Sequence, residues 1–331
     1  MRKIILHIGS PKTGTTSIQK FLHLNYETLA ELDRTIYPMT GRKDSDNIIR
    51  YSHNLLLPSI TAHKGNTQAL LASINKEAIE QKQIIISAEL FFSKLFRPAV
   101  QRSLKTIKNT FRSDEVKILI YLRRWDLYLE SVYNQAVKQW LTNVSIDKYI
   151  EQREKAIGWH PADYLRYIAV LENIFGKDAI EIRSFDKQAF IGGDLYKDFC
   201  HATDLQHIEH YKKPKKSNES LTTTQLLATI LLAPLFNKKD NAFVVGKIKK
   251  HLKAQHKSYS EFCLFSNESR QAIINRFEND EHKLRTYMKK PDSFLFDSKA
   301  FNDKSSLPPV EFSFEELKAL RDSVLILGKL P

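Results

Sequence analysis

Short apolar runs alternate with longer amphipathic stretches along the first part of the chain. The short runs are rich in β-branched residues and carry few charges, as strands covered on both faces do. They predict strands at Lys3–Ile8, Thr35–Tyr37, Gln83–Ser87, Val116–Leu122 and Ala179–Arg183. The stretches between them predict helices at Thr15–Leu24, Thr67–Gln81, Ala99–Phe111, Trp125–Leu141 and Pro161–Phe175. This alternation predicts an α/β fold in three layers, with helices on both sides of a central parallel sheet.

After Arg183 the strand pattern fades and helical spacing takes over. Further helices are predicted at Asp194–Ala202, Leu221–Phe236, Ser269–Met288 and Phe314–Leu327, and Lys247–Lys257 is strongly basic. No run reaches the roughly 20 apolar residues of a membrane span. The apolar start of the chain breaks at Gly9, too early for a signal peptide. We therefore expect a soluble, cytoplasmic protein with one large domain.

The charge balance narrows the classes of partner. The 331 residues carry a formal net charge of +13, which favours anionic partners such as nucleotides, acidic glycans or an anionic membrane surface touched peripherally. No nucleic-acid-binding motif accompanies the basic runs, so nucleic acid is not expected. The two cysteines are far apart, which fits a reducing compartment. The sequence has no metal-binding constellation such as H-E-x-x-H.

The segment Ile4–Leu22 predicts an anion site. A buried strand is followed by a loop with Gly9 and Gly14, and then by an amphipathic helix. Such a junction directs backbone N–H groups and the positive end of a helix dipole at one place. The two glycines have the spacing of the nucleotide-triphosphate P-loop G-x-x-x-x-G-K-[ST], but Thr15 stands where that motif has lysine, and Lys12 lies inside the loop.

The loop Pro11-Lys12-Thr13-Gly14-Thr15-Thr16 resembles the 5′-phosphosulfate loop of sulfotransferases that use 3′-phosphoadenosine 5′-phosphosulfate (PAPS). The resemblance implies that these residues and Ser17 hold the phosphosulfate. It also implies that Lys12 contacts the oxygen bridging phosphate and sulfate. PAPS would be a co-substrate that leaves as adenosine 3′,5′-bisphosphate.

A second segment resembles the 3′-phosphate motif of the same family. Arg123 directly follows the fourth predicted strand, Ser131 comes eight residues later, and Tyr133 stands two beyond. An arginine and a serine placed in this way hold phosphate by charge-assisted hydrogen bonds. The Asn-Pro that often follows the arginine is replaced by Arg124-Trp125.

A looser similarity lies later in the chain. Asn218–Leu221 resembles a segment of bacterial sulfotransferase domains, and the lysines just before it, including Lys213 and Lys215, would then cover the nucleotide phosphates. A solvated basic turn explains them equally well. The resemblance implies a sulfotransferase domain over residues 1–300, with a C-terminal extension at 301–331 carrying one helix.

Sulfuryl transfer requires a base for the proton of the acceptor hydroxyl. Glu89 is the first candidate, because it follows the third strand and should stand at the sheet's carboxyl edge; a helix-start carboxylate is the alternative reading. His53, in a loop after the second strand, is the second candidate. His7 is expected to be a hydrogen-bonded core residue.

The acceptor is expected to be a carbohydrate, such as a polysaccharide, a lipopolysaccharide or a glycolipid. Two other functions remain open at this point. A P-loop kinase or NTPase would share the strand–loop–helix but needs a lysine after Gly14. A non-enzymatic polyanion or nucleic-acid binder would use Lys212–Lys216 and Lys247–Lys257 as its basic surface.

Overall fold

The computed structural model describes residues 1–42, 50–57, 66–215, 221, 223–232, 241–251, 264–289 and 295–296. Its residues fall into two compact units. The first comprises the described parts of Met1–Arg124, Tyr164–Ser217 and Glu278–Phe296, and the second those of Trp125–Asp163 and Asn218–Phe277. The predicted domain boundary at residue 300 and the predicted helix Phe314–Leu327 lie outside the described residues.

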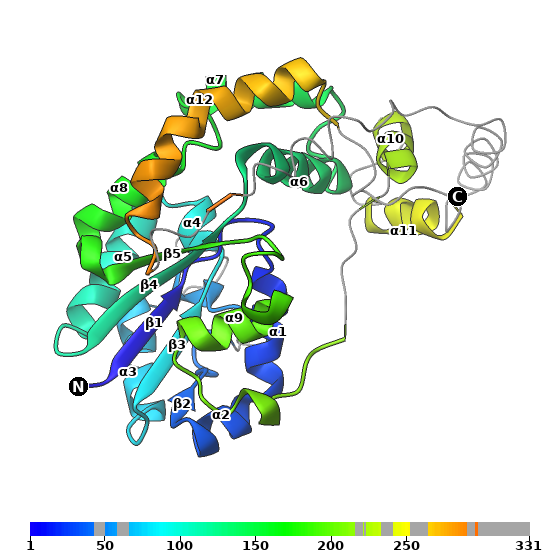
Figure 1. Ribbon diagram of the computed structural model, residues 1–331. Helices are drawn as coiled ribbons and strands as arrows, with labels where there is room; N and C mark the ends of the chain where they lie inside the picture. The colour runs from blue at the N-terminus through cyan, green and yellow to red at the C-terminus, as the bar shows by residue number, and fades with distance from the viewer. Residues whose placement is uncertain are drawn as a thin grey trace. The chain divides into compact units, whose positions relative to one another are not determined.

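A five-stranded, all-parallel sheet forms the centre of the first unit (Figure 1). Its strands are β1 (Lys3–His7), β2 (Thr35–Ile36), β3 (Gln83–Ser87), β4 (Glu115–Leu122) and β5 (Ile180–Ser184), in the order β2-β3-β1-β4-β5. The predicted α/β fold with a central parallel sheet is therefore confirmed, and each strand lies within one residue of its predicted bounds. Sequence periodicity located these strands because almost every residue in them is buried.

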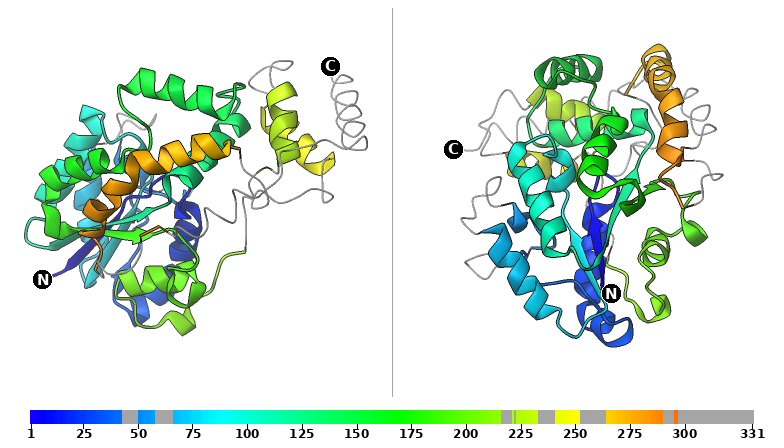
Figure 2. Two further views of the ribbon diagram at one scale, coloured as in Figure 1. Left: turned by 45° about the horizontal axis from the view of Figure 1, so that its top comes forward. Right: turned by 90° about the vertical axis from the view of Figure 1, so that its left-hand side faces the viewer.

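Helices cover both faces of the sheet. Alternate strand residues point to opposite faces, and Ile5, Ile85 and Leu119 form one core with Phe21 of α1 and Phe199 of α9. On the other face α5 packs against α3 and α8 (Figures 1 and 2). The helices of this unit are α1 (Thr15–Leu24), α2 (Tyr26–Leu32), α3 (Thr67–Glu77), α4 (Leu90–Ser93), α5 (Pro98–Thr110), α8 (Tyr164–Phe175) and α9 (Leu195–Ala202).

The second unit is helical in its described residues. Its helices are α6 (Trp125–Lys138), α7 (Ile146–Ile157), α10 (Thr223–Leu232), α11 (Asn241–His251) and the part of α12 (Asn267–Arg285) up to Phe277. Residues 252–257 of the predicted basic stretch lie outside the described residues. The sequence did not predict α7, which buries only Ile146 and Ile150 and therefore has a thin apolar stripe.

A buried ion cluster holds the second unit together. Arg270 of α12 is fully buried, and its guanidinium donates to Asp126 of α6 and, at 2.5 Å, to Glu130 of the same helix. Glu130 also accepts a hydrogen bond from the backbone N–H of Leu264 at 3.0 Å. These bonds join α6 to α12, and the three charged side chains that form them are all fully buried.

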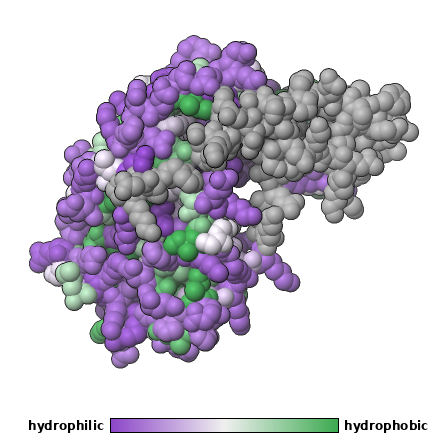
Figure 3. Space-filling view, viewed as in Figure 1, coloured by the Kyte–Doolittle hydropathy of each residue, from purple (hydrophilic) through white to green (hydrophobic). Residues whose placement is uncertain are grey.

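The part of the chain that the structure describes contains no helix both long and apolar enough to span a membrane. The surface seen in Figure 3 is mostly hydrophilic, with apolar side chains in small separate patches.

Candidate functional site

The loop after β1 lies at a switch point of the sheet. β1 is central, with β3 on one side and β4 on the other, and the chain leaves β1 towards β2 but leaves β4 towards β5. In open α/β sheets, ligands bind at the carboxyl ends of strands where the connections diverge in this way. The register pairs His7, the last residue of β1, with Ser87 of β3 and Leu119 of β4. The loops that follow β1, β3 and β4 therefore share one edge of the sheet.

The backbone of the loop is wound tightly around small residues. A Cβ atom on Gly9 would stand 2.2 Å from Oγ1 of Thr15, so only glycine lets the helix start come this close. Gly14 has φ +71°, and a Cβ there would stand 2.6 Å from Leu195 and 2.9 Å from Phe185. Lys12 has φ 67°, a left-handed conformation that is unfavourable for a residue with a side chain. Packing on this loop thus holds Lys12 in a strained geometry, as is common at ligand sites.

Two buried hydroxyl groups inside the loop have no hydrogen-bond partner. Ser10 Oγ and Thr15 Oγ1 are buried and have no hydrogen-bond partner in the structure. Helix α1 begins at Thr15 with Gly14 as its N-cap and without a side-chain cap, so N–H groups of its first turn have no intrahelical acceptor. Buried polar groups in proteins are almost always satisfied. Two unsatisfied hydroxyls beside an uncapped helix start therefore fit an oxyanion held at this loop.

The other loop residues take different positions. Thr13 is buried and its hydroxyl donates to the carbonyl of Ser10 at 2.7 Å, which fixes the turn. Thr16 is exposed, Pro11 is half-buried, and the Ser17 hydroxyl bonds Tyr196 of α9. Thus the hydroxyls of Thr13 and Ser17 bond within the protein, and Thr16 is exposed to solvent.

Arg123 stands at the end of the neighbouring strand β4. It follows Leu122 directly and is half-buried, and its carbonyl accepts a hydrogen bond from the Tyr164 hydroxyl at 2.8 Å. Among the described residues, no carboxylate pairs with its guanidinium. A strand-end arginine in this state can bind an anion at the same edge as the β1 loop.

Glu89 and Lys12 interact at this edge. Glu89 follows β3 and lies just before α4, and it is exposed. Neighbouring protein removes part of the hydration of its carboxylate, which raises the pKa, while the positive charge of Lys12 acts in the opposite direction; the net direction is upward. The structure therefore brings Lys12 and Glu89 together, and it gives Glu89 the raised pKa that suits a proton acceptor.

His53 lies beneath the same edge, with both ring nitrogens engaged. Its Nδ1 accepts from the backbone N–H of Ser87 at 3.2 Å, and its Nε2 donates to the carbonyl of Pro38 at 3.0 Å. The ring is fully buried, and burial together with the charge of Arg42 lowers the pKa of His53 to about 3. These contacts support a structural role, in which a neutral imidazole ties the loop at residue 53 to the end of β3.

His7 is the core residue that the sequence predicted. Its Nδ1 lies 2.9 Å from the hydroxyl of Ser87, which also accepts from Gln19 at 3.1 Å. Burial lowers the pKa of His7 to about 3. Two neutral histidines, His7 and His53, therefore both contact Ser87, the last residue of β3.

The two buried histidines predict a loss of stability in mild acid. In the unfolded chain they protonate near pH 6.5, but in the folded chain only near pH 3, so unfolding takes up protons below pH 6.5. The two neutral histidines therefore stabilise the fold fully above pH 6.5, and the free energy of unfolding declines as the pH falls from there towards 3. Between pH 7 and pH 5 we expect a loss of about 2 kcal/mol for each histidine, measured by urea unfolding at both pH values. His53→Gln and His7→Asn should each remove about half of this decline; an unchanged decline in both variants contradicts the assignment.

Ser131 belongs to the second unit, on α6, where it is buried. Tyr133 lies on the same helix, and its hydroxyl donates to the carbonyl of Val144 at 2.7 Å. Because Arg123 belongs to the first unit, the joint action of Arg123 and Ser131 on one phosphate stays a prediction.

The two lysines predicted to cover the phosphates are both exposed. Lys213 pairs with Asp194 at 2.5 Å, and Asp194 also caps α9. Lys215 has its side chain in solvent, and residues 216–220 lie outside the described residues. Lys213 is thus held beside the start of α9, which packs on the β1 loop through Leu195.

Sequence reasoning missed the role of Ser10 and of the two side chains that press on Gly14. Ser10 stands inside the recognised loop, so the motif itself contained the signal. Phe185 and Leu195 had no such signal, because they approach the loop only through folding. Among the described residues, no group of three His, Cys, Asp or Glu side chains is arranged to hold a metal ion.

The comparisons with known proteins add little to this geometry. No family model matches the chain. An uncharacterized protein of Archaeoglobus fulgidus is 27% identical over 186 residues, which cover 54% of this chain and 48% of that protein. A crystal structure of a sulfotransferase from Alicyclobacillus acidocaldarius overlaps with a TM-score of 0.39 at 15% identity, covering 73% of this chain and 96% of that one. At these values the likeness supports no statement about activity, so a function has to be argued from the site.

Proposed function

We propose that the protein is a sulfotransferase that moves a sulfuryl group from PAPS to a hydroxyl of a carbohydrate acceptor. The observation that carries the proposal is the β1 loop, which combines an uncapped helix start with the buried, unpartnered hydroxyls of Ser10 and Thr15. Its lysine, Lys12, lies inside the loop and not after Gly14, where the Mg²⁺–ATP motif has it. The sequence motif that resembles the 5′-phosphosulfate loop covers these same residues. A displaced lysine suits direct neutralisation of a phosphosulfate.

Each residue has a role set by its position. The loop N–H groups and hydroxyls bind the 5′-phosphosulfate, and Arg123 with Ser131 binds the 3′-phosphate. In the reaction, the acceptor oxygen forms a bond to sulfur as the bond between sulfur and the bridging oxygen breaks. Lys12 stabilises the negative charge that develops on that bridging oxygen, and Glu89 accepts the proton of the acceptor hydroxyl. Adenosine 3′,5′-bisphosphate and the sulfated acceptor are the products.

Glu89 is the better candidate base of the two. Its carboxylate is exposed at the edge that also bears Lys12, whereas both nitrogens of His53 are bonded inside the core. A group that accepts the proton must reach the acceptor hydroxyl directly or through one water. We therefore propose Glu89 as the base and His53 as a support of the strand end.

Replacing Glu89 by glutamine should lower turnover by about 10²–10⁴-fold and leave nucleotide binding unchanged, because only the proton acceptor is lost. In the wild type, turnover should rise with pH as Glu89 ionises, at a pH above the ordinary carboxyl range, since its pKa is raised. The measurement is turnover against pH with labelled PAPS. Glu80→Gln, the same change near the opposite end of β3, is the matched control. Equal turnover in Glu89→Gln and Glu80→Gln removes Glu89 from the mechanism.

The nucleotide itself tests the proposal. We expect adenosine 3′,5′-bisphosphate to raise the melting temperature without magnesium, and Lys12→Ala or Arg123→Gln to reduce that rise. Stabilisation that requires ATP together with magnesium would instead identify a kinase or NTPase. Salt-sensitive binding of polyanions with no response to either nucleotide would identify a polyanion binder.

A further inference from the structure

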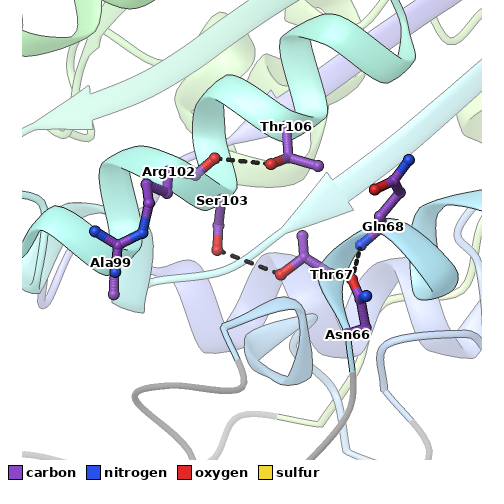
Figure 4. A pocket seen from close by; sticks show the side chains of 7 residues that line it. All are labelled: Asn66, Thr67, Gln68, Ala99, Arg102, Ser103 and Thr106. Carbon is purple, nitrogen blue, oxygen red and sulfur yellow. Dashed lines mark hydrogen bonds between the residues drawn. The ribbon is translucent and has the colours of Figure 1, made fainter.

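A polar pocket lies between α3 and α5 in the first unit (Figure 4). Its volume is about 270 Å³, close to the lower end of the roughly 300–1,000 Å³ of small-molecule sites. The start of α3 forms one wall and the first turns of α5 the other. The lining residues are Asn66, Thr67, Gln68, Ala99, Arg102, Ser103 and Thr106.

The chemistry of this lining selects the kind of ligand. Hydroxyl and amide side chains dominate among the described lining residues, and none of these seven is acidic or aromatic. The Thr67 and Ser103 hydroxyls lie 3.4 Å apart where α3 meets α5, at the weak end of hydrogen-bond distances. The Thr67 and Thr106 hydroxyls already donate to the carbonyls of Leu56 and Arg102, so they can accept hydrogen bonds from a ligand. The described lining thus suits a polyhydroxylated ligand and offers no stacking face to a flat aromatic one.

Arg102 adds a positive charge to the pocket. It is exposed on α5, and no carboxylate among the described residues pairs with its guanidinium. Guanidinium groups bind carboxylates in a bidentate geometry that adds specificity. A ligand that carries both hydroxyls and one carboxylate therefore matches the lining better than a neutral sugar does.

The pocket lies at the same edge of the sheet as Glu89. Helices that connect parallel strands run opposite to them, so the first turns of α3 and α5 stand at the carboxyl edge. Hydrogen bonds also link the pocket to that edge: the Thr67 hydroxyl donates to the Leu56 carbonyl at 3.0 Å, and the backbone N–H of His53 donates to the Ser87 carbonyl at 2.8 Å. Glu89 follows two residues after Ser87.

We infer that this pocket binds an acidic sugar unit, a uronate, in the acceptor, with its carboxylate on Arg102 and its hydroxyls on Thr67, Ser103 and Thr106. The inference rests on the proposed function, because it assigns the bound sugar to the acceptor whose hydroxyl reacts near Glu89. It narrows the acceptor from carbohydrates in general to glycans that contain an acidic residue.

Direct binding tests the inference without any turnover. Methyl α-D-glucuronoside, titrated into the full chain and followed by NMR, should bind more tightly than methyl α-D-glucoside, which has no carboxylate. Arg102→Gln should weaken binding of the glucuronoside roughly ten-fold, as expected for one charge-assisted contact. Lys105→Gln removes the same charge from an exposed position of α5 that does not line the pocket, and it should leave binding unchanged.

A second variant keeps the test independent of charge. Ala99→Leu fills the pocket from α5 and should also abolish glucuronoside binding, with an unchanged circular-dichroism spectrum as the check on folding. Equal binding of the glucuronoside by Arg102→Gln and the wild type overturns the inference. It is also overturned if inorganic sulfate displaces the glucuronoside at equal concentration, because the pocket is then a general anion site.

The inference and the proposed function fail separately. Adenosine 3′,5′-bisphosphate should bind Arg102→Gln and Ala99→Leu as tightly as it binds the wild type, since the nucleotide loop is unaltered. A chain that binds the glucuronoside but not this nucleotide would retain the sugar pocket and lose the assignment as a sulfotransferase. A chain that binds the nucleotide but not the glucuronoside would keep the assignment as a sulfotransferase and lose the sugar pocket.

Discussion

Lys12→Ala should lower turnover by about 10²–10³-fold while the protein remains folded, which is the typical loss when one preorganised charge or donor is removed from a developing anion. The reason is the position of Lys12 inside the β1 loop, beside the uncapped start of α1 and near Glu89. Turnover with labelled PAPS measures the loss, and thermal unfolding checks the fold. Lys76→Ala, an exposed lysine in the last turn of α3, removes the same charge away from the loop and should keep full turnover.

The backbone of Lys12 allows a sharper version of the same experiment. Its φ of 67° is unfavourable for lysine and for alanine, but it is readily adopted by glycine. Lys12→Gly should therefore keep the free energy of unfolding unchanged or raise it by about 1 kcal/mol, and it should lose turnover as fully as Lys12→Ala. A variant that is as stable as the wild type and still active would show that the lysine is strained without serving the reaction.

Arg270→Met should lower the free energy of unfolding by about 3–5 kcal/mol, because it leaves the carboxylates of Asp126 and Glu130 buried without their cation. Denaturant unfolding measures this value. Arg276 provides a control on the same helix: it pairs with Glu154 at 2.7 Å but is half exposed, so Arg276→Met should cost less than about 1 kcal/mol. A similar, small effect of both substitutions would show that the buried cluster adds little to the stability of the second unit.

The cluster of Arg270, Asp126 and Glu130 also affects the proposed nucleotide site, because it holds α6 in place. Glu130 stands next to Ser131 on α6, so the bonds from Arg270 fix the helix that carries the proposed 3′-phosphate ligand. Replacing all three charged groups by apolar residues of similar volume would restore much of the stability lost in Arg270→Met. Nucleotide binding by that variant then shows whether the charged cluster is needed to position α6 for the nucleotide or only to stabilise the fold.

Hydrophobic patterning was sufficient for the sheet and for most of the helices. All five strands are short, β-branched and buried, and each was predicted within one residue. The pattern missed α2, which buries only Leu29, and α4, which buries Phe91 and Phe92 but is a single turn of four residues, too short to show a helical period. Where few residues meet the core, tertiary packing and not periodicity decides that a helix forms.

The sequence by itself determined the parallel α/β fold, and it predicted an anion loop after the first strand, because strand burial and glycine spacing are local properties. It also named Lys12, Arg123 and Glu89, since strand ends in such folds point to one edge. Only the tertiary structure decided that His53 is bound at both nitrogens inside the core and that Arg102 faces a polar pocket beside α3. These facts depend on residues far apart in the chain, and a histidine or an arginine looks the same in the sequence whether its partners are bonded to it or absent.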